Sequence, residues 1–235
     1  MWYKIKRIYQ CTNLVRPPFP VPKSWLLWYR PLQTDLKDVS NNWNNWSWYS
    51  GTGSFGTVWW YTWARVTRSS SNPWYSTQHI ITPVNRSNPT ISICWWICYT
   101  QMSDTLWTWR WLFWNWWSGS SQQIMLWLRS ADNKYPYFQW NWTNYKLSSS
   151  TPSTNTWYFR VITRNGSTLK FYLNGTLANT LSISSSDIWN WVFKFGCTWY
   201  DSWWNWWTEW YVRHCAIYNK VLTDAEVLQF YNNTK

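Results

Sequence analysis

Short apolar runs separated by polar segments recur along most of this 235-residue chain. The polar segments are rich in Ser, Thr and Asn, and the apolar runs between them include residues 80–81, 91–94, 123–126 and 158–162. Apolar runs of this length, bounded by turn-forming residues, are typical of β-strands rather than of helices. The pattern therefore predicts an all-β protein built from many short strands.

A β-hairpin is the clearest local prediction. Apolar and polar side chains alternate in residues 157–163 and 168–173, and Asn165-Gly166 lies between these segments. Asn-Gly readily adopts the two positive φ angles of a type I′ turn, so we expect that turn here. A second Asn-Gly, Asn174-Gly175, follows at once and leads into residues 176–178. Together these segments predict a meander of antiparallel strands.

One short helix is predicted close to the C-terminus. Thr223 and Glu226 have the spacing of a capping box, and the apolar-rich segment 227–231 follows them. Asp224 and Glu226 are also the only two carboxylates that lie two positions apart, which invites a catalytic interpretation. Acidic side chains are favoured at a helix start by the helix dipole. We therefore expect these two acids to be structural.

The proline-rich segment 17–22 separates a short N-terminal segment from the rest of the chain. Its sequence, PPFPVP, favours an extended and stiff connector, because each proline fixes φ and lacks a backbone N–H. We therefore predict an N-terminal docking segment at residues 1–22 and one domain at residues 23–235. The basic and apolar N-terminal segment suits a docking strand that tethers the domain to a larger assembly, and a disordered tail is the alternative.

Neither a secretory signal nor a membrane span is predicted. The first twenty residues interleave basic and apolar side chains, and no apolar stretch of about 18 residues occurs. The formal net charge is +12, but the basic residues are scattered, so no nucleic-acid partner is expected. The five cysteines include no Cys-x-x-Cys pair, which favours buried free thiols over a disulfide framework or a zinc site.

Three segments carry a family resemblance. Residues 157–161 followed by 166–175 resemble the "W-h-h-v … dG … l-Y-v-N-G" motif of laminin-G-like, concanavalin A-like lectin domains. Residues 216–227 resemble the closing motif of that family, and residues 26–40 resemble its opening motif. The three segments keep the order that they have in the family. The resemblance implies a concanavalin A-like jelly-roll sandwich of two antiparallel sheets.

The resemblance implies a lectin-like domain that binds glycans or cell-surface or virion proteins without catalysis, outside the cell or on a virion. The alternative is a structural decoration domain of a phage virion or cell-surface complex. Glycosidases need two carboxylates about 5–10 Å apart, and no predicted strand carries such a pair among the nine acids. Neither histidine accompanies a Ser or Cys nucleophile motif, and we expect His214 to be a packed or rim residue of the strand 211–218.

The resemblance also implies where ligands would bind. Loops at one edge of the sandwich are the expected ligand site, with Tyr200, Asp201 and Asn205 as candidate residues, although an ordinary solvated loop explains these residues as well. Many relatives bind Ca²⁺ through loop carboxylates, and Asp38 and Asp201 are the candidate ligands. The family's often acidic positions in its last strand are Arg213 and His214 here, which weakens the calcium prediction. Ligand identity and oligomeric state do not follow from the sequence.

The chain contains 30 Trp and only 7 Gly, an inversion of the usual proportions. The family has glycines where this chain has Trp43 and Trp46, and replacing both by Gly converts residues 40–47 into the family pattern. Asn adjoins ten of the tryptophans, at positions 43, 46, 114, 116, 140, 142, 189, 191, 204 and 206. Asn-Gly is favourable in turns, whereas Trp is costly where φ must be positive.

We therefore hypothesise that most of these tryptophans are glycines in the living protein, encoded by a reassigned UGA codon. Trp157, and one of Trp95 and Trp96, have the strand context of genuine tryptophans. The alternative keeps every Trp as an aromatic surface that stacks on sugars or lies at a membrane interface. The codons at these positions distinguish the two hypotheses.

Overall fold

The structure is a computed structural model of the whole chain. It describes residues 26–30, 47–49, 54–58, 61–66, 79–85, 90–102, 109–115, 124–129, 135–140, 143–148, 151–184, 192–195 and 208–235. The predicted docking segment 1–22 and its boundary with the domain lie outside these residues and stay predictions.

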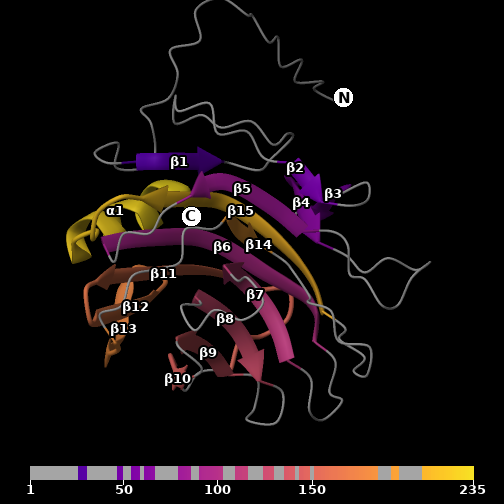
Figure 1. Cartoon of the computed structure of the whole chain (residues 1–235). Coiled ribbons are helices and arrows are strands. Elements are labelled where there is room, and N and C mark those ends of the chain that lie inside the picture. Colours follow the sequence, from indigo (N-terminus) through magenta and orange to yellow (C-terminus); the bar gives the residue numbers. More distant parts are fainter. Residues whose placement is uncertain are drawn as a thin grey trace, which may run out of the picture.

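Two antiparallel sheets make up the described part of the chain (Figure 1). Sheet A contains β1 Leu26–Arg30, β3 Ser54–Val58, β4 Tyr61–Val66, β6 Thr90–Met102, β11 Trp157–Asn165, β12 Thr168–Leu173, β13 Thr176–Ser182 and β15 Thr208–Tyr218. Its strand order is β13-β12-β11-β6-β15-β4-β3, and β1 pairs with β15.

Sheet B contains β2 Ser47–Tyr49, β5 His79–Asn85, β7 Trp109–Asn115, β8 Ile124–Arg129, β9 Tyr135–Trp140, β10 Thr143–Lys146 and β14 Val192–Phe195. Its strand order is β10-β9-β8-β7-β14-β5-β2. The chain crosses between the sheets repeatedly, so that neighbouring strands are often distant in sequence. The predicted all-β sandwich of two antiparallel sheets with one C-terminal helix is confirmed.

The predicted meander is present as β11, β12 and β13, but the first turn differs from the prediction. Asn165 pairs with Thr168, so the turn consists of Gly166 and Ser167, and only Gly166 (φ +56°) has a positive φ. A type I′ turn centred on Asn165-Gly166 is therefore wrong, and the single positive φ matches a type II′ turn. The second turn has positive φ at both Asn174 (50°) and Gly175 (82°), as type I′ requires.

Strand pairing explains the shifted first turn. The observed register places Phe171 opposite Ile162 and Tyr172 opposite Val161. Such aromatic and β-branched pairs across strands are favourable. A turn centred on Asn165-Gly166 would slide the strands and place Phe171 opposite Arg160. The packing of the sheet thus outweighs the local preference of Asn-Gly.

The helix α1, Asp224–Thr234, closes one face of sheet A. Side chains of β6, β11, β12, β15 and α1 form one buried cluster there, and ring stacking between Phe159 and Phe230 (5.0 Å between centroids) joins strand to helix. The Trp96 indole Nε1–H donates to Thr234 Oγ1 at 2.8 Å, and its ring stacks on Tyr231. This helix is where the sequence predicted it.

Trp95 and Trp96 are neighbours in β6, and both are buried, at 1% and 4% exposed. Trp96 belongs to the cluster under α1, so its neighbour Trp95 faces the opposite side of sheet A. The hypothesis that only one of the two is genuine stays a prediction. Among the described residues, the non-glycine residues with positive φ are Asn155, Asn174 and His214.

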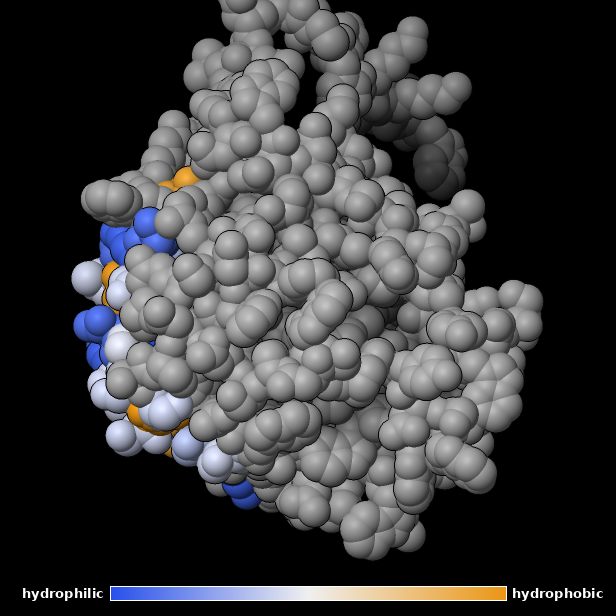
Figure 2. All heavy atoms as spheres, in the orientation of Figure 1, coloured by the Kyte–Doolittle hydropathy of each residue, from blue (hydrophilic) through white to orange (hydrophobic). Residues whose placement is uncertain are grey.

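The outer surface over α1 and β13 is mostly hydrophilic on the face shown in Figure 2. In the described part of the chain, the exposed large hydrophobic residues are Leu177 and Leu228. Within the same residues, no helix combines the length and the apolar character needed to cross a membrane. Cys94, Cys98 and Cys215 are buried free thiols, as expected, whereas Cys11 and Cys197 lie outside the described residues.

Candidate functional site

A small cavity between the two sheets is the candidate functional site. Residues from β9, β11, β12 and the segment between β10 and β11 line it: Pro136, Ser148, Pro152, Tyr158, Arg160, Phe171 and Leu173. The cavity volume is about 10 Å³, which is room for about one water molecule. Ser148, Tyr158 and Leu173 are half-buried, whereas the other lining residues are buried, so the cavity reaches the edge of the sandwich.

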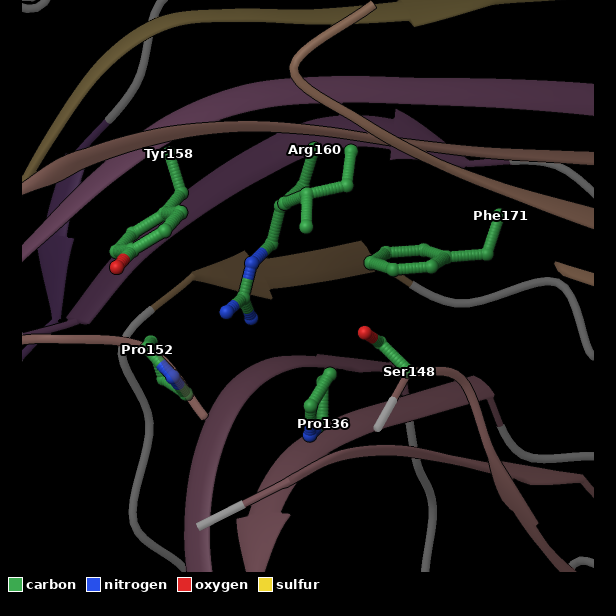
Figure 3. A pocket seen from close by; sticks show the side chains of 7 residues that line it. Pro136, Ser148, Pro152, Tyr158, Arg160 and Phe171 are labelled. Atoms are coloured by element: carbon green, nitrogen blue, oxygen red, sulfur yellow. The ribbon is translucent and has the colours of Figure 1, made fainter. Parts of the chain in front are cut away.

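Arg160 supplies the charge of this cavity. Phe159 and Val161 pack under α1, so alternation along β11 turns Tyr158, Arg160 and Ile162 toward sheet B. Figure 3 shows the Arg160 guanidinium pointing into the space above Pro136 and Pro152. The Ser148 hydroxyl points into the same space from the opposite side.

The Arg160 guanidinium is buried without a counter-charge among the described residues. The residue is 2% exposed, and its buried Nε and Nη1 atoms make no hydrogen bond. The Tyr99 ring lies 5.5 Å from the guanidinium carbon and provides a cation–π contact. Such a contact contributes about 0.5–2 kcal/mol, whereas a buried unpaired charge costs several kcal/mol. The cavity is therefore strongly electropositive.

Arg164, four residues further along β11 and on the same face, differs from Arg160 in its partners. It is also buried, at 1% exposed, but its Nε donates to the Gly166 carbonyl at 3.0 Å and its Nη2 to the Ser184 carbonyl at 3.3 Å. These carbonyls lie at the two-residue turn and beyond the end of β13. Backbone carbonyls therefore fix the position of the Arg164 side chain, whereas Nε and Nη1 of Arg160 have no such partners.

Sequence reasoning missed Arg160, because residues 158–162 were grouped as one apolar run. The signal was nevertheless present. In a strand over 157–163, successive side chains point to opposite faces, so Arg160 shares a face with Ile162, and a charged residue on a predicted buried face is unusual unless it has a partner or a function.

The candidate residues predicted from the sequence lie elsewhere. Tyr200, Asp201, Asn205 and Asp38 are all outside the described residues, so the ligand loop and the calcium site stay predictions. Within the described ranges, no group of three or more His, Cys, Asp and Glu side chains is placed to hold a metal ion.

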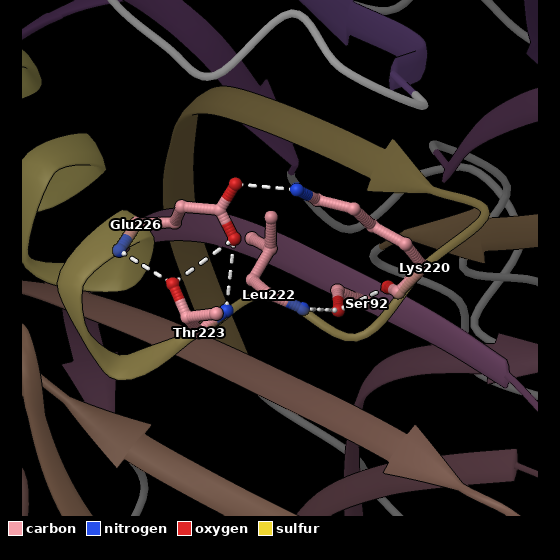
Figure 4. A network of polar contacts seen from close by, with 5 residues as sticks. All are labelled: Ser92, Lys220, Leu222, Thr223 and Glu226. Atoms are coloured by element: carbon pink, nitrogen blue, oxygen red, sulfur yellow. Dashed lines mark hydrogen bonds and ion pairs between the residues drawn. The ribbon is translucent and has the colours of Figure 1, made fainter.

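The acidic pair at the start of α1 is structural. Thr223 and Glu226 form the predicted capping box, in which Glu226 N–H donates to Thr223 Oγ1 at 3.3 Å and Thr223 N–H donates to Glu226 Oε2 at 2.9 Å (Figure 4). Lys220 forms an ion pair with Glu226. Burial raises the pKa of Glu226, but these donors outweigh burial and hold that pKa below its ordinary value.

Asp224 is likewise engaged at the helix start. The Tyr172 hydroxyl donates to Asp224 Oδ1 at 2.7 Å, which lowers the pKa of Asp224, and Lys170 lies 3.5 Å from the same oxygen. Ser92 joins the helix start to β6, since its hydroxyl donates to the Lys220 carbonyl at 2.6 Å and accepts from Leu222 N–H at 2.9 Å (Figure 4). Both acids therefore make contacts that anchor the helix.

His214 lies at an irregularity in β15. The register of β15 against β6 shifts between Arg213 and Ala216, and His214 has φ +47°. Burial, reinforced by the charge of Arg213, lowers the pKa of His214 to about 3. A half-buried histidine with this pKa is neutral near pH 7 and is too weak a base for ordinary proton abstraction, in agreement with the predicted packed or rim role.

Comparison with known proteins identifies the fold and its relatives. The model of the concanavalin A-like lectin/glucanases superfamily matches residues 69–228. No curated protein matches the chain. One similar solved structure is the binding domain of paraclostridial mosquitocidal protein 1, at 18% identity and a TM-score of 0.69, with 89% of this chain and 52% of that chain covered.

Two further similar structures hold sugars. The ligand-binding domain of botulinum neurotoxin serotype D, in complex with N-acetylneuraminic acid, has 17% identity and a TM-score of 0.65 over 89% of this chain and 51% of that one. Domain 4 of AbnA, an extracellular arabinanase from Geobacillus stearothermophilus in complex with arabinotriose, has 16% identity and a TM-score of 0.64. That match covers 87% of this chain and 97% of the arabinanase domain. By contrast, this chain spans about half the length of the toxin domains.

Proposed function

Because the chain belongs to the concanavalin A-like lectin/glucanase superfamily, we propose that it is a non-catalytic carbohydrate-binding domain. The match to the arabinanase domain carries this proposal, since it covers nearly the whole of a domain that binds arabinotriose. The toxin domains support a ligand-binding role less directly, because about half of each of them has no counterpart in this chain.

The proposed setting is outside the cell, on a cell surface or on a virion. The arabinanase to which the chain is similar is extracellular, which supports this setting. The N-terminal segment 1–22 is proposed to attach the domain to a larger assembly. The proposed partner is a glycan or a surface protein that carries one.

The ligand is proposed to bind at the loop residues Tyr200, Asp201 and Asn205. Aromatic and amide side chains are suitable for this purpose, because a ring stacks on a sugar face while an amide bonds its hydroxyls. Asp38 and Asp201 are proposed as oxygen ligands for Ca²⁺. Asp224 and Glu226 both hold α1 in place, which is compatible with the proposed non-catalytic role.

A glycan array followed by calorimetry tests this function. The protein for this test should carry the residues that its own coding sequence specifies, including glycine wherever a reassigned UGA codon encodes it. We expect saturable binding to at least one glycan, with arabinan oligosaccharides as the first probes, and no release of reducing sugar during incubation. Asp201→Asn should weaken binding, whereas the matched variant Asp224→Asn should leave it unchanged. Weaker binding after EDTA treatment would support the calcium site.

Two outcomes would contradict the proposal. Absence of binding to every glycan would favour the alternative, a structural decoration domain of a virion or cell-surface complex. Steady release of reducing sugar from a bound oligosaccharide would identify a glycosidase instead.

A further inference from the structure

We propose that the Arg160 cavity is a binding site for a carboxylate group. This inference goes beyond glycan binding by the loops and does not depend on it. It rests on the buried charge of Arg160, on the shape of the cavity and on the contrast with Arg164.

The charge argument begins with burial. Arg160 is 2% exposed, and its Nε and Nη1 donors make no hydrogen bond in the structure. An arginine side chain cannot lose its charge inside a protein, so it cannot relieve its burial by releasing a proton. The Tyr99 ring provides a cation–π contact but accepts no hydrogen bond from these two donors. The site therefore favours an anion that accepts hydrogen bonds.

The shape of the cavity selects a small anionic group. With room for about one water molecule, the cavity admits a single anionic oxygen but not a whole sugar ring. Charge-assisted hydrogen bonds between guanidinium and carboxylate are short and strong. The Ser148 hydroxyl at the cavity provides a second polar group (Figure 3). The rest of a larger ligand would lie outside, beside the half-buried Tyr158 and Leu173.

The carboxylate can come from two sources, a free small acid or the acidic group of a sugar. Thermal unfolding with sodium formate, sodium glucuronate, neutral glucose and sodium chloride, at equal ionic strength, distinguishes them. Formate should raise the Tm of the wild type, because a ligand that binds the native state stabilises it. Protection by glucuronate as well would identify acidic sugars as ligands, and protection by formate alone would identify small free acids.

Arg160→Met is the direct test, and Arg164→Met is its matched control on the same face of the same strand. Formate affinity should fall at least about tenfold in Arg160→Met, which is the effect of losing a charge-assisted hydrogen bond. The affinity for formate should be unchanged in Arg164→Met. Equal protection by chloride and formate, or unchanged affinity in Arg160→Met, would overturn the proposal.

Nuclear magnetic resonance provides a test that needs no variant to fold. In the wild type, the Arg160 Nε–H signal should shift on titration with formate, while the Arg164 Nε–H signal, already bonded to the Gly166 carbonyl, should stay in place. Shifts of both signals to the same extent, or of neither, would contradict a carboxylate site at Arg160.

Discussion

At the scale of single residues, the strand positions of a few polar side chains set their chemistry. Alternation along β11 buries Arg160 and Arg164 on one face, and only the second finds backbone carbonyl partners close to a turn. In β15, His214 lies at a register shift with a positive φ, and burial, reinforced by the charge of Arg213, lowers its pKa. The position of each polar side chain in its strand thus sets its burial and the hydrogen-bond partners within its reach.

The lowered pKa of His214 predicts a pH dependence of stability. Between pH 6.5, the ordinary pKa, and about 3, the native pKa, the unfolded chain binds a proton that the native chain does not. The free energy of unfolding should therefore fall as the pH falls, with a slope of up to about 1.4 kcal/mol per pH unit.

Urea unfolding between pH 4 and pH 7 measures this effect. His214→Asn should reduce the slope, since Asn does not titrate and tolerates a positive φ. An unchanged slope in His214→Asn would contradict the prediction.

At the scale of elements, the β12–β13 turn and α1 depend on each other. Asn174 N–H donates to the Phe159 carbonyl at 2.8 Å, and Asn174 Oδ1 accepts from Phe159 N–H at 2.9 Å, so the turn also bonds β11. A Cβ atom on Gly175 would lie 3.0 Å from Tyr231 Cδ1 of α1. Glycine is therefore required there for two reasons, the positive φ and the close approach of the helix.

Comparison of two glycines tests this coupling. Gly166→Ala should cost roughly 1–2 kcal/mol, because only the positive φ opposes a side chain and nothing lies within 4 Å of the added carbon. Gly175→Ala should cost more, since Tyr231 and Leu228 must also move. Urea denaturation of both variants provides the measurement, and equal losses would show that the helix contact does not matter.

At the scale of the whole molecule, several irregularities in strand pairing lie beside tryptophans. Strand register shifts occur beside Trp28, Trp111 and Trp210, in the pairs β1–β15, β7–β8 and β15–β6. Glycine inside a strand often marks such a bulge, whereas tryptophan has no preference for one. Register shifts also occur at Phe171/Tyr172, Val192/Phe193 and Arg213/Ala216, so the hypothesis of reassigned UGA codons stays a prediction.

The coding DNA tests that hypothesis directly. We expect UGA at Trp43, Trp46, Trp204 and Trp206, with UGG at Trp157 as the control. The intact mass of the native protein should then lie below 28.9 kDa, because glycine is lighter than tryptophan. UGG codons at the first four positions would refute the hypothesis and favour the aromatic-surface alternative.

Much of the fold followed from local patterns, and the turn at Gly166 shows where those patterns fail. The strands, the meander and the capping box at Thr223 depend on residues close in sequence, and the structure contains them. The first turn type was wrong because cross-strand packing of Phe171 and Tyr172 decides the register. The candidate ligand residues at 38, 200, 201 and 205 stay predictions.

The sequence by itself determined the fold class and the start of α1, because alternation along strands and helix caps are short-range effects. Only the tertiary structure decided that Arg160 lies in a cavity and that α1 leaves no room beside Gly175. Pro136, Ser148 and Arg160 belong to different elements, and no local pattern predicts how they meet. Their meeting depends on how two sheets stack, which is a property of the whole chain.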